Sequence, residues 1–140
     1  MLGQSILLVD DEELLRLSLQ VNMEREGFAV DTAESGEEAL TALQDCPYSL
    51  LLTDYLMVGI SGIELMQQAK SLHPGIKVIV FSGYEDLDLT HEIRRLGADD
   101  FFCKPIDFDD LLERTDCKCA EIVSKNSPRG YRMSLFARFV

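Results

Sequence analysis

The sequence lacks several features that would place it in other protein classes. No apolar run approaches the roughly 20 residues that a membrane-spanning helix needs, and the N-terminus has no basic stretch followed by a long apolar one. A basic excess is also missing, because the formal net charge is −12, whereas nucleic-acid phosphates select basic surfaces. We therefore expect a cytoplasmic protein with no membrane contact and no direct nucleic-acid binding by this segment.

The overall composition is that of an ordinary globular chain. Hydrophobic residues make up 46% of the 140 residues and charged residues 27%. A chain of this length buries a core without disulfide bonds, so the four cysteines are expected to be reduced thiols.

Charge is distributed unevenly along the chain. All 25 acidic residues precede residue 124. Residues 124–140 have no acidic residue but four basic ones, Lys125, Arg129, Arg132 and Arg138. Ser127-Pro128 and Gly130 are typical of a break in regular structure. We expect one domain over residues 1–123 and a basic C-terminal tail over 124–140 that serves as a linker or docking arm.

Short apolar runs alternate along the body with patterns of helical spacing. The strand-like runs are 6–9, 28–32, 50–52, 78–81 and 101–102. Apolar residues at helical spacing predict helices at Leu14, Leu17 and Val21; at Leu65, Ala69 and Leu72; at Leu89, Ile93 and Leu96; and from Phe108 to Cys119. Two capping patterns add to these. Ser35 can cap a helix whose Glu38 side chain reaches back to it, and Asp107 can cap the last helix. This alternation predicts a parallel sheet with helices on both faces.

Polar side chains stand where the predicted strands end. The buried-looking run Leu50–Thr53 ends on Asp54, although burying an unpaired charge is costly. Ligands of such sheets bind at the carboxyl ends of the strands, where this chain has Asp10, Asp11, Asp54, Ser82 and Lys104. Taken one by one, these residues have ordinary explanations, such as helix capping by Asp10-Asp11 or a surface position for Lys104.

As a set, these residues suit phosphoryl chemistry. Three crowded carboxylates favour a hard divalent cation such as Mg²⁺. Lys104 and the Ser82 hydroxyl offer donors to phosphate oxygens, and a carboxylate can itself be the nucleophile that forms an acyl phosphate. The sequence therefore predicts a site for phosphorylating Asp54.

Four segments resemble the successive signatures of the receiver domain of two-component response regulators: ILLVDDEE, LLLTDYLMVGISG, VIVFSGYED and GADDFFCKP. The resemblance covers roughly residues 4 to 123. It implies a flavodoxin-like, doubly wound α/β fold with five parallel strands in the order 2-1-3-4-5 and five helices. It also implies a Mg²⁺-dependent signalling phosphoacceptor that assists only its own phosphorylation and dephosphorylation and is not otherwise an enzyme.

The resemblance also assigns roles to individual residues. Asp54 corresponds to the phosphoacceptor, and Asp11, Asp54 and the backbone carbonyl of Leu56 to direct Mg²⁺ ligands, with Asp10 acting largely through water. Lys104 corresponds to the phosphate-contacting lysine, Ser82 to the switch hydroxyl and Phe101 to the switch aromatic. Leu56 and Tyr84 correspond to the positions that flank the path of the hydrolytic water.

Three positions depart from the common family pattern. Val58 replaces a proline, which predicts a less rigid loop after Asp54. Ser82 replaces the commoner threonine, and Phe101 lacks a tyrosine hydroxyl, so its ring is expected to favour the inward position even before phosphorylation. No catalytic group is lost.

The implied partners are a sensor histidine kinase or a histidine phosphotransfer protein, and downstream a protein target or an output domain missing from this chain. A phosphorylation-dependent homodimer is also implied. Two alternatives stay open at this point. One is an interaction module that needs no phosphate, and the other is a small phosphatase with an aspartyl nucleophile, although Glu12 stands where its second aspartate belongs.

Overall fold

The computed structural model describes residues 5–83 and 87–126, within two compact units that meet in the chain at Pro105 and Ile106. The elements of the first unit are β1 (Ser5–Val9), α1 (Glu13–Arg25), β2 (Ala29–Ala33), α2 (Gly36–Asp45), β3 (Leu50–Asp54), α3 (Gly62–Leu72), β4 (Lys77–Ser82), α4 (Leu87–Arg95) and β5 (Asp100–Cys103). The second unit contains α5 (Phe108–Asn126). This helix continues past residue 123, and the expected boundary there stays a prediction.

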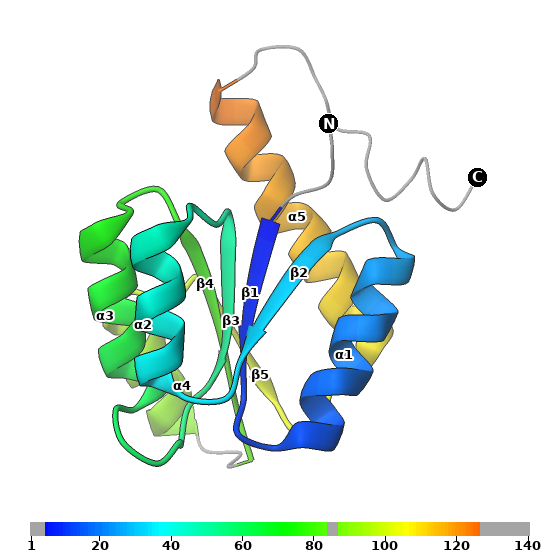
Figure 1. The fold of residues 1–140 in the computed structure, drawn as a ribbon. Helices are drawn as coiled ribbons and strands as arrows, with labels where there is room; N and C mark the ends of the chain where they lie inside the picture. The colour runs from blue at the N-terminus through cyan, green and yellow to red at the C-terminus, as the bar shows by residue number, and fades with distance from the viewer. Residues whose placement is uncertain (1–4, 84–86, 127–140) are drawn as a thin grey trace. The chain divides into compact units, whose positions relative to one another are not determined.

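All five strands form one parallel sheet in the order β2-β1-β3-β4-β5 (Figure 1). The expected strand order and helix number are therefore confirmed for the described residues. From β1 the chain passes to β2 on one side and then to β3 on the other, so the topological switch point lies between β1 and β3.

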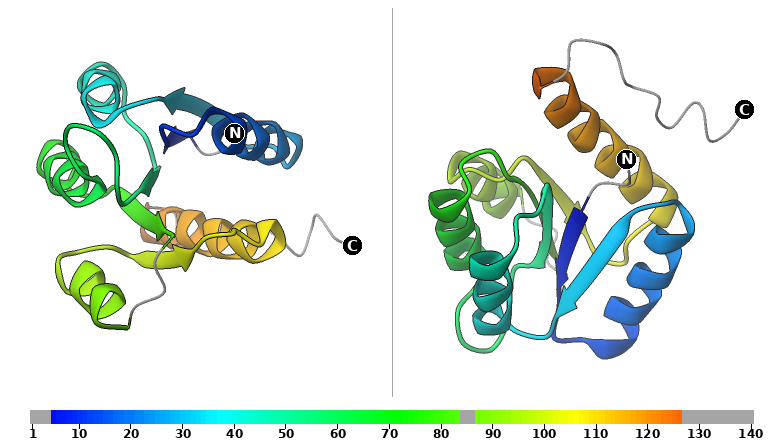
Figure 2. Two further views of the ribbon diagram at one scale, coloured as in Figure 1. Left: turned by 90° about the horizontal axis from the view of Figure 1, so that it is seen from below. Right: turned by 45° about the horizontal axis from the view of Figure 1, so that its top comes forward.

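Helices cover both faces of the sheet in the first unit (Figure 2). On one face, strand residues such as Leu7, Leu51 and Val80 share a buried core with residues of α2, α3 and α4. On the other face, α1 lies against β1 and β2. The central strand β3 is buried along its whole length, which explains why it is an unbroken apolar run up to Thr53.

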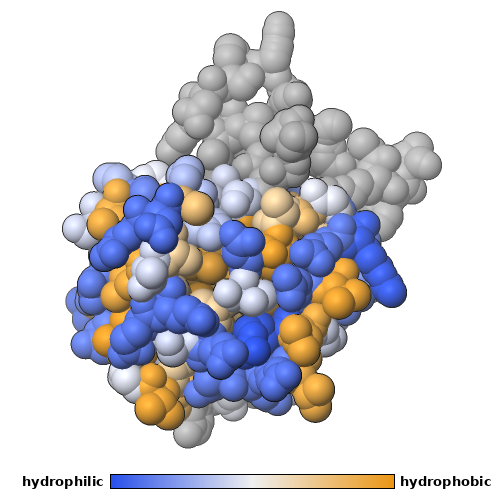
Figure 3. Space-filling model, in the orientation of Figure 1, coloured by the Kyte–Doolittle hydropathy of each residue, from blue (hydrophilic) through white to orange (hydrophobic). Residues whose placement is uncertain are grey.

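Helix α1 forms where the spacing of Leu14, Leu17 and Val21 predicted a helix. These three side chains do not face the core, however, because they are 81%, 42% and 49% exposed. The helix instead buries Arg16, Leu19 and Met23. Apolar residues occur all round α1, so their spacing alone could not identify the inner face. An apolar stripe consequently lies on the outer side of α1, where apolar side chains gather in Figure 3.

The predicted helix caps are largely confirmed. Ser35 Oγ accepts a hydrogen bond from the Glu38 amide at 3.1 Å, whereas the Glu38 carboxylate reaches back to the amide of Glu34 rather than to that of Ser35. In the second unit, Asp107 Oδ1 accepts from the amide of Asp109 at 3.0 Å. Among the described helices, none is long and apolar enough to cross a membrane.

Candidate functional site

The sheet brings the predicted polar residues to one edge. Asp54 and Ser82 are the last residues of β3 and β4, while Asp10 follows β1 and Lys104 follows β5. The strands are parallel and paired in register, with Asp54 beside Phe81 and Ser82 beside Cys103. These four residues therefore lie at the carboxyl ends of neighbouring strands, and Asp10 and Asp54 border the switch point.

Lys104 joins the two buried carboxylates at this edge. Its Nζ lies 3.2 Å from Asp10 Oδ2 and 3.2 Å from Asp54 Oδ2. A third carboxylate oxygen, Oε1 of Glu12, is 4.0 Å away. Asp10 is fully buried and Asp54 is 7% exposed, so these charges meet where water screens them little.

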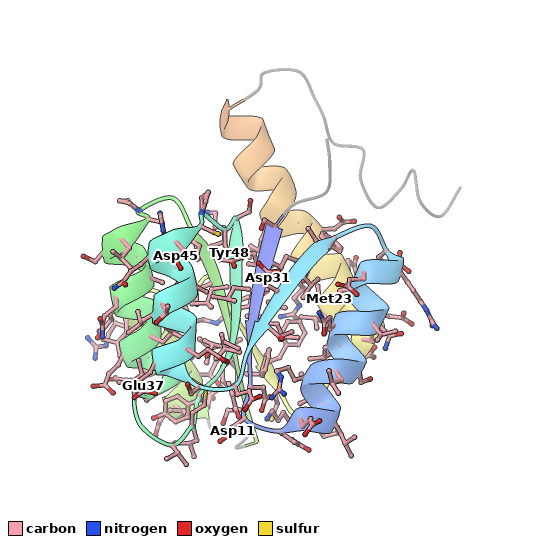
Figure 4. All side chains as sticks on the ribbon, viewed as in Figure 1. Asp11, Met23, Asp31, Glu37, Asp45 and Tyr48 are labelled. Carbon is pink, nitrogen blue, oxygen red and sulfur yellow. The ribbon has the colours of Figure 1, made fainter. Side chains whose placement is uncertain are left out.

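Three aspartates form a set of oxygen donors that could hold a cation. Carboxylate oxygens of Asp10, Asp11 and Asp54 all lie within 4.8 Å of one another. Asp11, labelled in Figure 4 at the end of the sheet, is exposed and gives the set an opening to solvent. An all-oxygen donor set with three negative charges suits a hard divalent ion, so these residues fit Mg²⁺.

The electrostatics of the site favour added positive charge. Burial raises the pKa of the Asp54 carboxyl, the Asp10 carboxylate raises it further, and Lys104 offsets only part of this. Burial alone would lower the pKa of the Lys104 ammonium, but the carboxylates of Asp10 and Asp54 outweigh it and the net shift is upward. Burial and the neighbouring carboxylates together thus raise the pKa of Asp54 by more than the single lysine lowers it.

Main-chain contacts hold Asp54 at the mouth of the loop that joins β3 to α3. Thr53 Oγ1 donates to the Asp54 carbonyl at 3.0 Å, and the Tyr55 amide donates to the Phe81 carbonyl at 2.8 Å. A Cβ on Gly62, the first residue of α3, would collide with the Asp54 carbonyl. Because the obstacle is backbone, only glycine fits at that position without displacing the loop.

The same loop also lies close to the start of α2. Gly59, which has a φ of +90°, passes so near Glu37 that a Cβ there would meet the carboxylate at 2.6 Å (Glu37 is labelled in Figure 4). The side chain of Ile60 lies directly over Gly36. The loop expected to be less rigid because of Val58 thus has tight neighbours on α2, while Val58 itself is 86% exposed.

The remaining predicted residues occupy different surroundings. Ser82 is almost fully buried and its carbonyl accepts from the Lys104 amide at 2.8 Å. The Phe101 ring is buried in the core that includes Val80 and Ile93, so it points inward in this structure. Leu56 is 52% exposed in the loop after Asp54. Tyr84 lies outside the described residues.

Sequence reasoning missed two neighbours of the site. The buried guanidinium of Arg16 donates to the carbonyl of Asp10 at 2.8 Å. The ring of Phe81 lies under Lys104, with Nζ 5.8 Å from its centroid. A lone arginine among leucines and a phenylalanine inside an apolar strand carry no signal that distinguishes them from surface and core residues.

Known proteins resemble this chain over most of its length. The family model of the response regulator receiver domain matches residues 6–116. Sporulation initiation phosphotransferase F of Bacillus subtilis is 33% identical over 113 residues, which are 81% of this chain and 91% of that protein. A solved CheY-like receiver domain from Methanospirillum hungatei has a TM-score of 0.83 and 32% identity, covering 88% of this chain and 98% of that one.

Longer proteins match as well. Transcriptional regulatory protein QseB of Haemophilus influenzae is 32% identical over 109 residues, which are 78% of this chain and 49% of that protein. DNA-binding transcriptional regulator NtrC of Klebsiella pneumoniae is 33% identical over 123 residues, which are 88% of this chain and 26% of that protein. The chain spans about half and about a quarter of these two relatives. It belongs to the receiver domains of two-component response regulators, a family in which a phosphoacceptor role is typical.

Proposed function

We propose that this receiver domain accepts a phosphoryl group on Asp54, in a Mg²⁺-dependent reaction, from a sensor histidine kinase or a histidine phosphotransfer protein. The observation that carries the proposal is the position of Lys104 Nζ, 3.2 Å from a carboxylate oxygen of both Asp10 and Asp54 at the switch point of the sheet. A buried carboxylate beside an ammonium and an acidic donor set has the groups that phosphoryl transfer requires.

The chemistry is a direct displacement at phosphorus. An Asp54 carboxylate oxygen forms a bond to phosphorus while the bond from phosphorus to the donor's histidine nitrogen breaks, and that nitrogen keeps the electron pair. Lys104 orients and partly neutralises the transferring group. Asp11, Asp54 and the Leu56 carbonyl would hold Mg²⁺, with Asp10 acting largely through water, and the ion would supply further positive charge. The result is an acyl phosphate on Asp54.

The phosphorylated state is proposed to be transmitted through Ser82 and Phe101. The Ser82 hydroxyl donates to the new phosphoryl oxygens, and the Phe101 ring, already inward here, is stabilised in that position. Phosphorylation then shifts a population rather than creating a new state. The output is a downstream protein target, a homodimer or an attached output domain, since relatives such as NtrC are much longer than this chain.

The apolar stripe of Leu14, Leu17 and Val21 on α1 supports a protein as the phosphodonor. A contiguous exposed apolar surface is typical of an interaction site. The helix starts three residues after Asp10, so its first turn adjoins the acidic edge. We propose that a protein donor contacts this stripe while it presents its phosphohistidine to Asp54.

Labelling with acetyl phosphate and Mg²⁺ tests the acceptor assignment. We expect intact-mass spectrometry to show one added phosphoryl group on the wild type and none on Asp54→Asn, because an amide oxygen is a poor nucleophile. Asp45→Asn removes an exposed carboxylate of α2 and is the matched control, which should label normally. Labelling that persists in Asp54→Asn would move the acceptor elsewhere.

The two alternatives predict different results in the same preparation. A phosphatase would turn over a general phosphomonoester such as p-nitrophenyl phosphate many times per protein molecule. A phosphate-independent interaction module would bind no Mg²⁺ and take up no label. We expect neither outcome, because all three aspartates and the lysine are assembled at one edge.

The lifetime of the acyl phosphate is a second expectation. By the family resemblance, Leu56 and Tyr84 correspond to the positions that flank the approach of the hydrolytic water, and neither side chain has an amide or carboxylate that could orient it. Because positioning supplies much of the catalysis in phosphoryl transfer, we expect slow hydrolysis. Leu56→Asn combined with Tyr84→Glu should shorten the lifetime several-fold in a mass-spectrometric time course. A wild-type lifetime of seconds that the double variant leaves unchanged would refute this.

A further inference from the structure

Arg16 is the unexpected residue of α1. Its side chain is 8% exposed, whereas Leu14 and Val21 on the same helix face solvent. Burying a guanidinium in place of a leucine is unfavourable unless hydrogen bonds repay its desolvation. The orientation of α1 therefore calls for a reason beyond the burial of apolar surface.

The hydrogen bond of Arg16 goes to the main chain and not to a carboxylate. Nη1 donates to the Asp10 carbonyl at 2.8 Å, while Nη2 lies 3.8 Å from Oε2 of Glu34, a side chain that is 74% exposed. An ion pair so long and so exposed contributes little. The short bond holds the peptide that joins Asp10 to Asp11 without neutralising either carboxylate.

Asp10 is held at every polar atom. Its amide donates to the Ala33 carbonyl at 3.2 Å, Oδ1 accepts from the Glu12 amide at 2.8 Å, and Oδ2 accepts from Lys104 at 3.2 Å. Asp11 differs, because its carboxylate makes no hydrogen bond or ion pair with any described residue. The position of the Asp11 carboxylate therefore depends on the backbone that Arg16 holds.

We propose that Arg16 is a positioning residue for the cation site, fixing the Asp10–Asp11 peptide so that the Asp11 carboxylate stays near those of Asp10 and Asp54. This inference rests on the proposed Mg²⁺-dependent function. Replacing groups that orient metal ligands typically lowers metal affinity about 10- to 100-fold. We expect a loss of that size for Mg²⁺ when Arg16 is replaced.

The sign of the effect separates positioning from simple electrostatics. If Arg16 acted only through its charge, removing it would leave the acidic site more negative, and Mg²⁺ would bind more tightly. A positioning role predicts the opposite, weaker binding. Arg16→Met keeps the bulk of the side chain but removes both donors and charge. Arg25→Met removes the same charge from an exposed position in the last turn of α1 and is the matched control.

The measurement is a calorimetric titration of Mg²⁺ into metal-free protein at a temperature where circular dichroism shows each variant folded. We expect the dissociation constant to rise about 10- to 100-fold in Arg16→Met and to stay within about twofold of wild type in Arg25→Met. Arg16→Lys should lie several-fold above wild type, since one ammonium can reach the carbonyl but lacks the planar fork. If Arg16→Met does not fold, the Arg16→Lys variant still tests the inference.

Labelling with acetyl phosphate gives an independent reading. The Mg²⁺ concentration for half-maximal labelling should rise with the dissociation constant, while the rate at saturating Mg²⁺ stays within about twofold of wild type, because Arg16 touches neither Asp54 nor Lys104. Unchanged or tighter Mg²⁺ binding in the Arg16 variants would overturn the inference. Wild-type protein that binds no Mg²⁺ would instead overturn the proposed function.

Discussion

The two edges of the sheet arrange charge in opposite ways. At the amino ends of β4 and β5, the Asp99 carboxylate lies 3.0 Å from Lys70 Nζ and 3.9 Å from Lys77 Nζ, and it accepts from the Val78 amide at 2.9 Å. At the carboxyl ends, one ammonium of Lys104 stands among carboxylates of Asp10, Asp54 and Glu12. One edge surrounds an acid with donors, and the other surrounds a base with acids.

The difference separates groups that stabilise the fold from groups that await a ligand. Asp99 links α3 to two strands and has a donor at each of its carboxylate oxygens, so it contributes to stability. At the carboxyl edge, burial first and then the excess of carboxylates around Lys104 raise the pKa of Asp54. Such an excess destabilises the protein alone but is relieved when a cation binds. We expect changes at the two edges to have opposite effects on stability.

The largest effect is expected at the amino edge, around Asp99. Asp99→Ala leaves Lys70 and Lys77 facing each other and the Val78 amide without its carboxylate acceptor. Removing the carboxylate that these partly buried donors share should lower the free energy of unfolding by about 2–3 kcal/mol, measured in urea. Asp45→Ala, at an exposed position of α2, should change it by less than about 0.5 kcal/mol. Equal effects of the two variants would refute the contrast.

Adding Mg²⁺ should restore balance at the other edge. A ligand that binds only the folded state at 100 times its dissociation constant stabilises by about 2.7 kcal/mol. We expect the melting temperature to rise with Mg²⁺ and to fall back on addition of EDTA. Asp99→Ala should keep this response in full, whereas Asp54→Asn, which lacks one of the three carboxylates, should show a smaller one.

A smaller effect of opposite sign is expected for Asp54→Asn in metal-free buffer. The amide still accepts a hydrogen bond from Lys104, but the repulsion with Asp10 and the desolvation of a charge are removed. Relief of such strain at a functional site typically raises the free energy of unfolding by about 1 kcal/mol. A variant less stable than wild type in EDTA would show that the acidic edge is not strained.

The pH dependence provides the control for this gain. The pKa of Asp54 is raised in the folded protein. Below the ordinary value of about 3.9 the carboxyl is therefore protonated in the folded and the unfolded state, and it does not lower the free energy of unfolding. As the pH rises through the raised folded value, the wild type loses stability relative to Asp54→Asn. The difference in free energy of unfolding between wild type and Asp54→Asn should therefore grow as the pH rises and vanish in acid. A difference independent of pH would assign it to another cause.

Much of the architecture follows from local patterns. The unbroken apolar run that ends at Asp54 predicted a buried strand, and Ser35 and Asp107 predicted helix starts, because strand burial and capping depend on residues only a few positions apart. Alternation of strands and helices predicted the parallel sheet, and from it the edge where Asp54, Ser82 and Lys104 gather.

Local patterns failed where an answer depended on distant partners. The apolar residues of α1 are distributed around the helix, so only packing against the sheet decided that Arg16 points inward and Leu14 outward. The sequence suggested that Lys104 reaches a phosphate, but its bridge between Asp10 and Asp54 joins residues 94 and 50 positions apart. The residues by themselves determined which groups are present at the site. Only tertiary packing decided which atoms meet, because burial and charge pairing act between segments brought together by the fold.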